Sequence, residues 1–236
     1  MSPALFDQNT LLSIETRLSE LTLKYASKSP RLHRAINYSL LNGGKRLRAL
    51  LTKASSQLID SQNSNWIDCA CALEMLHCYS LIHDDLPAMD DDDLRRGKAT
   101  NHIKFDEATA ILAGDALLTM AFEVLSNTTL SNQIKIKQIQ ILAKASGANG
   151  MVAGQSIDLD ATGKEIDFEQ LKNMHKLKTG ALILASVQIG ALCEPSITAD
   201  QQQTSKHYAE KIGLAFQVID DVLDVESDTQ TLGKPQ

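Results

Sequence analysis

Two clusters of aspartates carry the strongest chemical signal in this sequence. The first, DDLPAMDDDD, spans residues 84–93, and the second, DDVLD, spans residues 220–224. Each follows an apolar pattern of helical period, so both are expected at the C-terminal end of a helix, where carboxylates are destabilising unless a cation offsets them. Mg²⁺ prefers carboxylate oxygens and commonly binds one or two of them together with substrate phosphates. The clusters therefore favour Mg²⁺ that a diphosphate shares; the alternative for residues 90–93 is a solvated acidic loop.

Helical spacing joins each cluster to polar residues upstream of it. One face of the later helix is predicted to collect Gln217, Asp220, Asp221 and Asp224, which are spaced 0, 3, 4 and 7. In the earlier helix, Glu74 and His77 share a face with Asp84. His77 is either a histidine satisfied within the core or a donor to a phosphate oxygen.

Three groups of cations accompany the acidic clusters. GGKRLR, residues 43–48, places Lys45 and Arg48 on one face at a predicted helix start, where backbone amides and arginines favour anions. Arg95 and Arg96 directly follow the first acidic run. The third group comprises Lys176, Lys178 and Thr179. Each cation alone reads as a solvated surface charge, but the acidic clusters and the cations together predict two diphosphate groups with Mg²⁺ between them.

The elements that must position these residues are predicted to be helices. The chain has 236 residues, of which 43 % are hydrophobic and only 4 % aromatic, and its frequent Leu and Ala favour helix over sheet. Apolar residues recur at helical spacing, with no strand pair and no hairpin signal, and residues 86–102 read as a loop. The sequence predicts an all-α chain with one domain over residues 1–236. Helices are expected at 11–21, 30–41, 45–58, 66–85, 108–125, 134–157, 168–192 and 204–225.

Composition and charge exclude several classes of protein. The net charge of −6 argues against nonspecific nucleic-acid binding. No apolar run is expected to span a bilayer, and residues 1–10 show no signal peptide. Four cysteines do not make a disulfide framework in a chain of this length. We therefore expect a cytoplasmic protein without a nucleic-acid or membrane partner.

The motifs, in their order along the chain, resemble the short-chain trans-isoprenyl diphosphate synthase family, and most closely its bacterial members that form farnesyl diphosphate. The motifs are GGKRLR, DDLPAMD, LAGDALL, GMVAGQSIDLD, KTGAL and FQVIDDVLD. The resemblance implies an isoprenoid-synthase-type helical bundle around a central cavity, two or three Mg²⁺ ions and a homodimer. It implies condensation of isopentenyl diphosphate with dimethylallyl or geranyl diphosphate through Mg²⁺-assisted ionisation to an allylic cation.

The resemblance also implies roles for individual residues. Metal ligands are expected at Asp84, Asp90 and Asp220, with Asp85 and Asp224 in support. The allylic diphosphate is expected to bind Arg95, Lys178 and Lys234. Isopentenyl diphosphate is expected to bind Lys45, Arg48, His77 and Arg96. Lys178, Thr179 and Gln217 form the expected catalytic set, because the last two would turn oxygen atoms toward the allylic cation.

Product length is expected to depend on Tyr79 and Ser80. Tyr79 lies five residues before Asp84, about 7 to 8 Å down the helix, where a bulky ring could stop the growing chain. The alternative for Tyr79 is plain core packing, and a geranylgeranyl diphosphate synthase is the alternative enzyme. A class I terpene cyclase is disfavoured by the second aspartate motif and by GGKRLR.

One feature departs from the family pattern. The sequence ends at Gln236, twelve residues past Asp224, where family members usually continue with further helices. We expect either an incomplete sequence or a shortened protein that lacks the C-terminal helices. In the second case, a non-catalytic partner of a synthase is a further alternative.

Overall fold

A computed structural model describes residues 7–58, 64–194 and 196–226, with only the backbone from residue 213 onward. The chain divides into two compact units. In the described part, unit 1 comprises residues 7–50 and 67–127, and unit 2 comprises the remainder. Both units are built from helices, which confirms the predicted all-α class, whereas the single domain over residues 1–236 stays a prediction.

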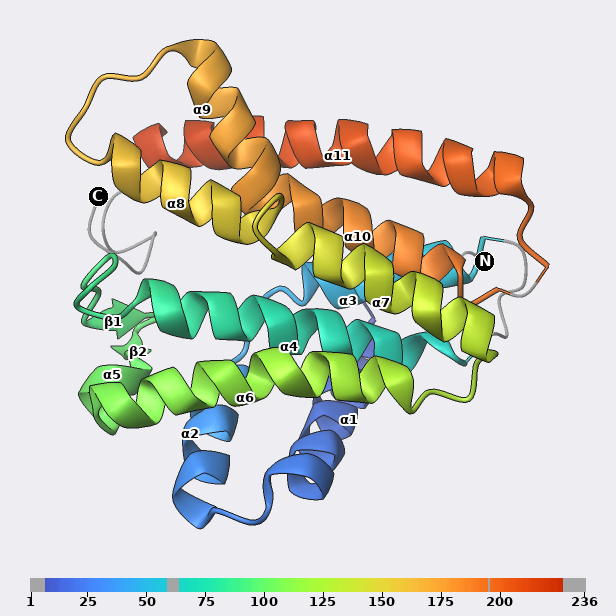
Figure 1. The fold of residues 1–236 in the computed structure, drawn as a ribbon, viewed down its shortest axis with the longest axis horizontal. Coiled ribbons are helices and arrows are strands. Elements are labelled where there is room, and N and C mark those ends of the chain that lie inside the picture. Colours follow the sequence, from blue (N-terminus) through green and yellow to red (C-terminus); the bar gives the residue numbers. More distant parts are fainter. Residues whose placement is uncertain (1–6, 59–63, 195, 227–236) are drawn as a thin grey trace. The chain divides into compact units, whose positions relative to one another are not determined.

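Unit 1 is organised around one largely buried helix. Its helices are α1 (Gln8–Ala26), α2 (Pro30–Leu40), the first turn of α3 (Leu47–Ser56), α4 (Trp66–Asp84), α5 (Asn101–Lys104) and α6 (Glu107–Ser126). Local signals fix the ends, because Asp7 and Ser29 accept backbone N–H bonds as N-caps of α1 and α2. Every residue of α4 from Cys69 to Leu76 is buried, so this helix lies in the core. It runs beside α6, where His83 Nε2 donates to the Ile111 carbonyl at 3.1 Å (Figure 1).

A short hairpin corrects the prediction of a plain loop without strands at residues 86–102. Strands β1 (Leu94–Arg95) and β2 (Lys98–Ala99) pair antiparallel, with Arg95 opposite Lys98. The two residues between them, Arg96 and Gly97, have φ of 53° and 73°. Positive φ at both central positions is the type I′ geometry that joins two strands with the twist of a sheet. Strands of two residues carry no readable alternation, which is why the pattern misses them.

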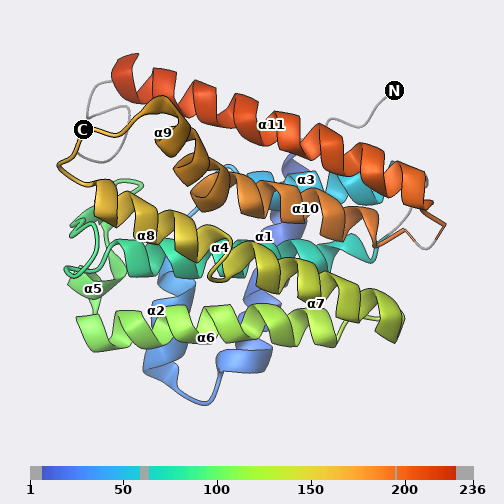
Figure 2. The same cartoon turned by 45° about the horizontal axis from the view of Figure 1, so that its top comes forward.

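Unit 2 is built from the end of α3 and the later helices. These are α7 (Asn132–Ser146), α8 (Met151–Ala161), α9 (Phe168–His175), the π-helical segment η1 (Lys176–Gly180), α10 (Ala181–Ala191) and α11 (Ala199–Glu226). The apolar helix α10 lies between α7 and α11 (Figures 1 and 2). It also packs tightly on α3, because a Cβ at Gly190 would stand 2.3 Å from the Thr52 carbonyl oxygen.

The structure also corrects the predicted helix over residues 134–157. The chain leaves the helix at Gly147, the C-cap of α7, and re-enters it after Gly150, the N-cap of α8. A Cβ at Gly150 would meet the Ala145 carbonyl oxygen at 2.2 Å, so the tight break requires glycine there. Apolar periodicity on both sides conceals the break.

Among the described residues, α6 is long and apolar enough to cross a membrane by length and composition. This corrects the expectation that no run has that property. Half of the apolar stretch is buried within the structure, as in a helix that packs in a protein core, so the signal is weak.

Candidate active site

Unit 1 brings the predicted cations of GGKRLR and of the hairpin together. The turn before α3 takes left-handed geometry at Gly43, Gly44 and Arg46, with φ of 69°, 115° and 48°. Arg96 reaches this turn from the hairpin and donates from Nη1 to the Gly43 carbonyl at 2.5 Å. A Cβ at Gly44 would stand 2.7 Å from the same Nη1 atom. Gly44 is therefore required both by its backbone angle and by the close approach of Arg96.

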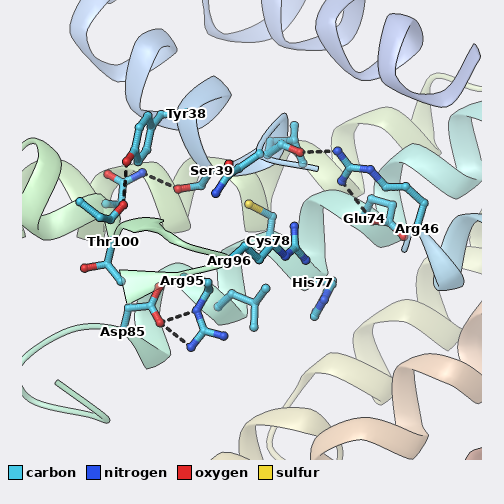
Figure 3. A pocket seen from close by; sticks show the side chains of 15 residues that line it. Tyr38, Ser39, Arg46, Glu74, His77, Cys78, Asp85, Arg95, Arg96 and Thr100 are labelled. Carbon is cyan, nitrogen blue, oxygen red and sulfur yellow. Dashed lines mark hydrogen bonds and ion pairs between the residues drawn. The ribbon is translucent and has the colours of Figure 1, made fainter. Parts of the chain in front are cut away.

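A pocket opens between this turn, α4 and the hairpin (Figure 3). Its wall contains His77 and Cys78 of α4, Asp85, and Arg95 and Arg96 of the hairpin. The pocket thus brings together His77 of α4 and the hairpin residues Arg95 and Arg96, all three of which are predicted ligand residues. The same wall contains Arg46 and Glu74, which the motifs left without a role.

His77 is held neutral by its surroundings. Its removal from water lowers its pKa well below the usual range, and the positive charges of Arg48, Arg96, Arg95 and Arg46 lower it further. The imidazole therefore carries no charge at neutral pH and can donate one N–H. Four guanidinium groups near one neutral ring make this part of unit 1 suited to a polyanion such as a diphosphate.

The first acidic cluster folds back over the end of α4. The Asp90 amide donates to the Asp84 carbonyl at 2.8 Å, and the Met89 amide donates to the Leu86 carbonyl at 2.8 Å. The first bond satisfies a carbonyl that the helix end leaves without a partner, and it brings the backbone of Asp90 to that of Asp84. Asp84 is buried and Asp90 is exposed.

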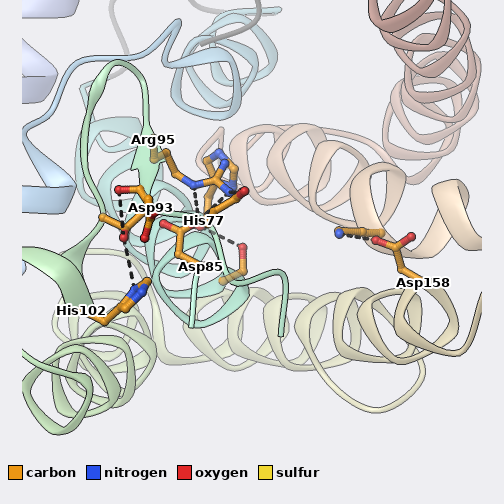
Figure 4. A network of polar contacts seen from close by, with 10 residues as sticks. His77, Asp85, Asp93, Arg95, His102 and Asp158 are labelled. Carbon is orange, nitrogen blue, oxygen red and sulfur yellow. Dashed lines mark hydrogen bonds and ion pairs between the residues drawn. The ribbon is translucent and has the colours of Figure 1, made fainter. Parts of the chain in front are cut away.

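Asp85 belongs to an ion-pair network with Arg95. Its carboxylate accepts from Arg95 Nε at 2.5 Å, and Arg95 also pairs with Asp92 at 3.2 Å (Figure 4). Burial raises the pKa of Asp85 to about 7, the Arg95 charge opposes that shift, and Asp92 and Asp84 add to it. Arg95, expected as a ligand of the allylic diphosphate, is thus held by two carboxylates at the pocket wall.

Two carboxylates at the end of α4 fit the chemistry of a Mg²⁺ ion that a diphosphate also binds. Among the side chains that the structure describes, no group of three His, Cys, Asp or Glu could hold a metal without further ligands. Asp84 and Asp90 stand at one helix end, and a cation there would offset the charge of the carboxylates and of the helix terminus. Asp220, the third expected ligand, lies in the part of α11 described only as backbone.

Unit 2 positions Lys178 through a contact that the sequence reading missed. Lys178 lies in the π-helical segment η1, and its Nζ donates to Asp158 Oδ2 at 2.5 Å (Figure 4). A Cβ at Gly154 would stand 2.2 Å from the Lys178 backbone nitrogen. Gly154 and Asp158, four residues apart on one face of α8, therefore fix both the backbone and the ammonium of Lys178. Their spacing within GQSIDLD is the signal that could have revealed this.

The remaining predicted residues divide into two groups. Tyr79 is buried in α4, and its ring meets the His83 ring edge-on with centroids 5.3 Å apart. Ser80 is also buried and donates to the His77 carbonyl at 2.8 Å. Thr179 follows Lys178 in η1. Gln217 lies in the backbone-only part of α11, and Lys234 lies outside the described residues.

Comparison with known proteins gives a consistent result. The family model of polyprenyl synthetases matches residues 29–236. Farnesyl diphosphate synthase of Haemophilus influenzae is 51 % identical over 202 residues, covering 85 % of this chain and 68 % of that protein. Farnesyl diphosphate synthase of Escherichia coli is 52 % identical over 205 residues, with the same coverage.

A solved structure agrees with these relatives. The crystal structure of a geranyltransferase from Helicobacter pylori, complexed with magnesium and isoprenyl diphosphate, superimposes with a TM-score of 0.88 at 36 % identity. It covers 100 % of this chain and 80 % of its own. The family match extends over most of the chain, and the alignments with the two relatives cover 85 % of it. This chain belongs to the polyprenyl synthetase family.

Proposed function

We propose that this chain condenses isopentenyl diphosphate with an allylic diphosphate, dimethylallyl or geranyl, to give farnesyl diphosphate and diphosphate. The observation that carries the proposal is the arginine-rich pocket of unit 1, in which a neutral His77 stands among cations beside the acidic end of α4. Polyprenyl synthetase membership and the farnesyl diphosphate synthases among the relatives supply the substrate class.

The arginine-rich pocket of unit 1, called the cation pocket below, binds the diphosphate of isopentenyl diphosphate. Arg96 in the pocket wall, together with Lys45 and Arg48 in the adjoining GGKRLR segment, supplies positive charge. Neutral His77 donates a single hydrogen bond without adding to the repulsion among the arginines. Because Arg96 is tied to the Gly43 carbonyl, its guanidinium is oriented before the ligand arrives.

Asp84, Asp90 and Asp220 would hold Mg²⁺, two or three ions in all. When bound, Mg²⁺ supplies neutralisation of the negative charge that develops on the leaving diphosphate. By the family resemblance, Arg95, Lys178 and Lys234 would bind that diphosphate. Within their own units, Arg95 is held by Asp85 and Lys178 by Asp158. Both cations are thus preorganised for charge that grows in the transition state.

The bond changes require little acid–base chemistry from the chain. The allylic carbon–oxygen bond breaks with its electron pair on the diphosphate, and the double bond of isopentenyl diphosphate forms the new carbon–carbon bond. The departing diphosphate accepts the proton that is then lost. By the family resemblance, oxygen atoms of Thr179 and Gln217 would stabilise the allylic cation, and the site would have to keep water away from that cation.

Tyr79 ends the growing chain at fifteen carbons. Its ring is buried in α4 and leans on His83, so the ring has little freedom to move aside. A geranylgeranyl diphosphate synthase, the alternative, needs room at this position. The proposed enzyme is a cytoplasmic homodimer without a nucleic-acid or membrane partner.

A product assay tests the proposal. The chain is mixed with Mg²⁺, labelled isopentenyl diphosphate and geranyl diphosphate, and the extracted products are sized. We expect a fifteen-carbon product that disappears when Mg²⁺ is chelated. A twenty-carbon main product would select the geranylgeranyl alternative, and no product would contradict the catalytic proposal and favour a non-catalytic partner of a synthase.

A further inference from the structure

Arg46 is a buried cation at the start of α3 that has no role in the proposed chemistry. Only 4 % of its side chain is exposed. Nη2 donates to the Leu40 carbonyl at 2.8 Å and to Glu15 at 3.2 Å, and Nη1 donates to Glu74 at 3.3 Å (Figure 3). One guanidinium thus connects the end of α2, helix α1 and helix α4 to the residue that directly precedes α3.

Two features of Arg46 lower the stability of the fold. Its φ of 48° is left-handed, a region that residues other than glycine rarely occupy. Its Nε–H is buried and has no hydrogen-bond partner among the residues that the structure describes. Buried unpaired donors and left-handed side-chain residues are each unfavourable, and they persist where surrounding contacts hold a residue in place for function.

Glu74 fixes the same region from α4. Its side chain is 5 % exposed, and while one oxygen accepts from Arg46, the other accepts from the Ala49 amide at 3.2 Å. That amide belongs to the first turn of α3, where helix N–H groups lack partners within the helix. A single carboxylate therefore holds both Arg46 and the start of α3.

The two predicted diphosphate ligands of this segment flank these contacts. Lys45 directly precedes Arg46, and Arg48 lies in the first turn of α3 that Glu74 holds. Arg46 itself is paired with carboxylates on α1 and α4, so its charge is largely offset before a ligand binds. Its contribution is accordingly one of geometry rather than of direct attraction.

We propose that Arg46 and Glu74 form a buried positioning pair, which sets the directions of Lys45 and Arg48 toward the diphosphate of isopentenyl diphosphate. The identity of this ligand rests on the proposed function. Both residues line the pocket wall, and we assign them to positioning rather than to direct bonds with the ligand. A weakened pair lets the turn and the start of α3 relax, and the cation pocket loses affinity while the allylic diphosphate ligands keep theirs.

Two variants and one matched control test the pair. Arg46→Lys keeps the charge, but a compact ammonium cannot bridge three separated acceptors as a planar guanidinium does. Glu74→Gln keeps an oxygen for the Ala49 amide and removes the ionic partner of Arg46. The control is Asp68→Asn, which breaks the 2.7 Å ion pair between Arg17 of α1 and Asp68 of α4, a pair that does not line the pocket.

Calorimetric binding of isopentenyl diphosphate is measured first, and the KM of each substrate second. Arg46→Lys and Glu74→Gln should weaken isopentenyl diphosphate binding and raise its KM about tenfold, the scale of one charge-assisted hydrogen bond. The KM for geranyl diphosphate should stay unchanged, and Asp68→Asn should change neither. A purely structural role would instead reduce the active fraction, which lowers kcat and leaves both KM values alone.

Several outcomes would overturn the proposal. Folded variants that bind isopentenyl diphosphate as tightly as the parent chain would overturn it. Equal increases in the KM values of both substrates would also overturn it. If Arg46→Lys fails to fold, Glu74→Gln decides alone. Binding that weakens in the variants of a chain without turnover would support the positioning pair and contradict the proposed condensation, so the two failures can be told apart.

Discussion

Substituting Gly44 by alanine should separate backbone strain from the placement of Arg96. The new Cβ would stand 2.7 Å from Arg96 Nη1 and 2.8 Å from its Cζ, closer than real Cβ atoms come, so the guanidinium must move. At φ of 115° the alanine is also strained by about 1–3 kcal/mol. The exposed bond from Arg96 to the Gly43 carbonyl adds less than about 1 kcal/mol. We expect Gly44→Ala to lower the free energy of unfolding by about 1–4 kcal/mol.

The effect on binding is larger than the effect on the local bond. A displaced Arg96 loses its charge-assisted hydrogen bonds to a diphosphate, about 1.5–3 kcal/mol, so isopentenyl diphosphate should bind roughly tenfold to a hundredfold more weakly. Gly43→Ala is the matched control, because Gly43 is also left-handed, with φ of 69°, but a Cβ there has no atom of the described residues within 4 Å. It should lower unfolding free energy by about 1–2 kcal/mol and leave binding intact.

Urea unfolding and calorimetric binding of isopentenyl diphosphate measure the two quantities separately. Equal weakening of binding by Gly44→Ala and Gly43→Ala would show that the contact with Arg96 has no effect beyond backbone strain. Normal binding by a Gly44→Ala protein that has lost stability would also rule out a role for this contact in binding.

Three further predictions concern single residues. Asp84→Ala should lower turnover about 10²-fold or more, as loss of an electrostatic stabiliser does, while Asp93→Ala, at the exposed end of the same cluster, should not; near-normal turnover in Asp84→Ala contradicts its role as a metal ligand. Tyr79→Ala should lengthen the product in a chain-length assay, and an unchanged product rejects Tyr79 as the end of the cavity. His77 should remain neutral in an NMR titration down to pH 6, because desolvation and the arginines depress its folded pKa. As the pH falls below about 6.5, the unfolded chain takes up a proton at His77 before the folded chain does, so His77 lowers folding stability. His77→Asn should remove that pH dependence. An imidazole that titrates near 6.5 in the folded chain would contradict the prediction.

Regular helical spacing made the largest part of this molecule predictable. Glu74, His77 and Asp84 repeat on one face of α4, and the first two of them line one pocket, because a buried helix without interruption preserves its period. The split between α7 and α8 escaped because apolar residues flank Gly147 and Gly150 at the same period. The hairpin at Arg96 escaped because its strands are too short to alternate.

Contacts between residues that are distant in the sequence were harder to predict from the sequence than the helices were. Asp158 holds Lys178 across twenty positions of sequence, and Glu74 holds Arg46 across twenty-eight. The residue type of each acid, and its position in the helical pattern, do not identify the cation that it binds. What distinguishes them is a partner that only the fold supplies, so a motif can indicate the ligand but not the residue that orients it.

The distribution of backbone strain leads to the same part of unit 1. Among the residues that the structure describes, left-handed φ outside glycine occurs at Arg46, Asp91 and Arg96. The first stands in GGKRLR, the second in the first acidic cluster and the third at the tip of the hairpin. Arg46 and Arg96 bond to other segments, and the Asp91 amide donates to the Leu86 carbonyl within its own cluster. Strain of this kind persists where surrounding structure overdetermines a residue, and it gathers at sites that must be rigid before a ligand arrives. Three segments that carry proposed diphosphate or metal ligands each contain one such strained residue. The described helices of unit 2 contain no residue other than glycine with left-handed φ. A relaxed backbone at any of the three should therefore gain stability and lose ligand affinity together.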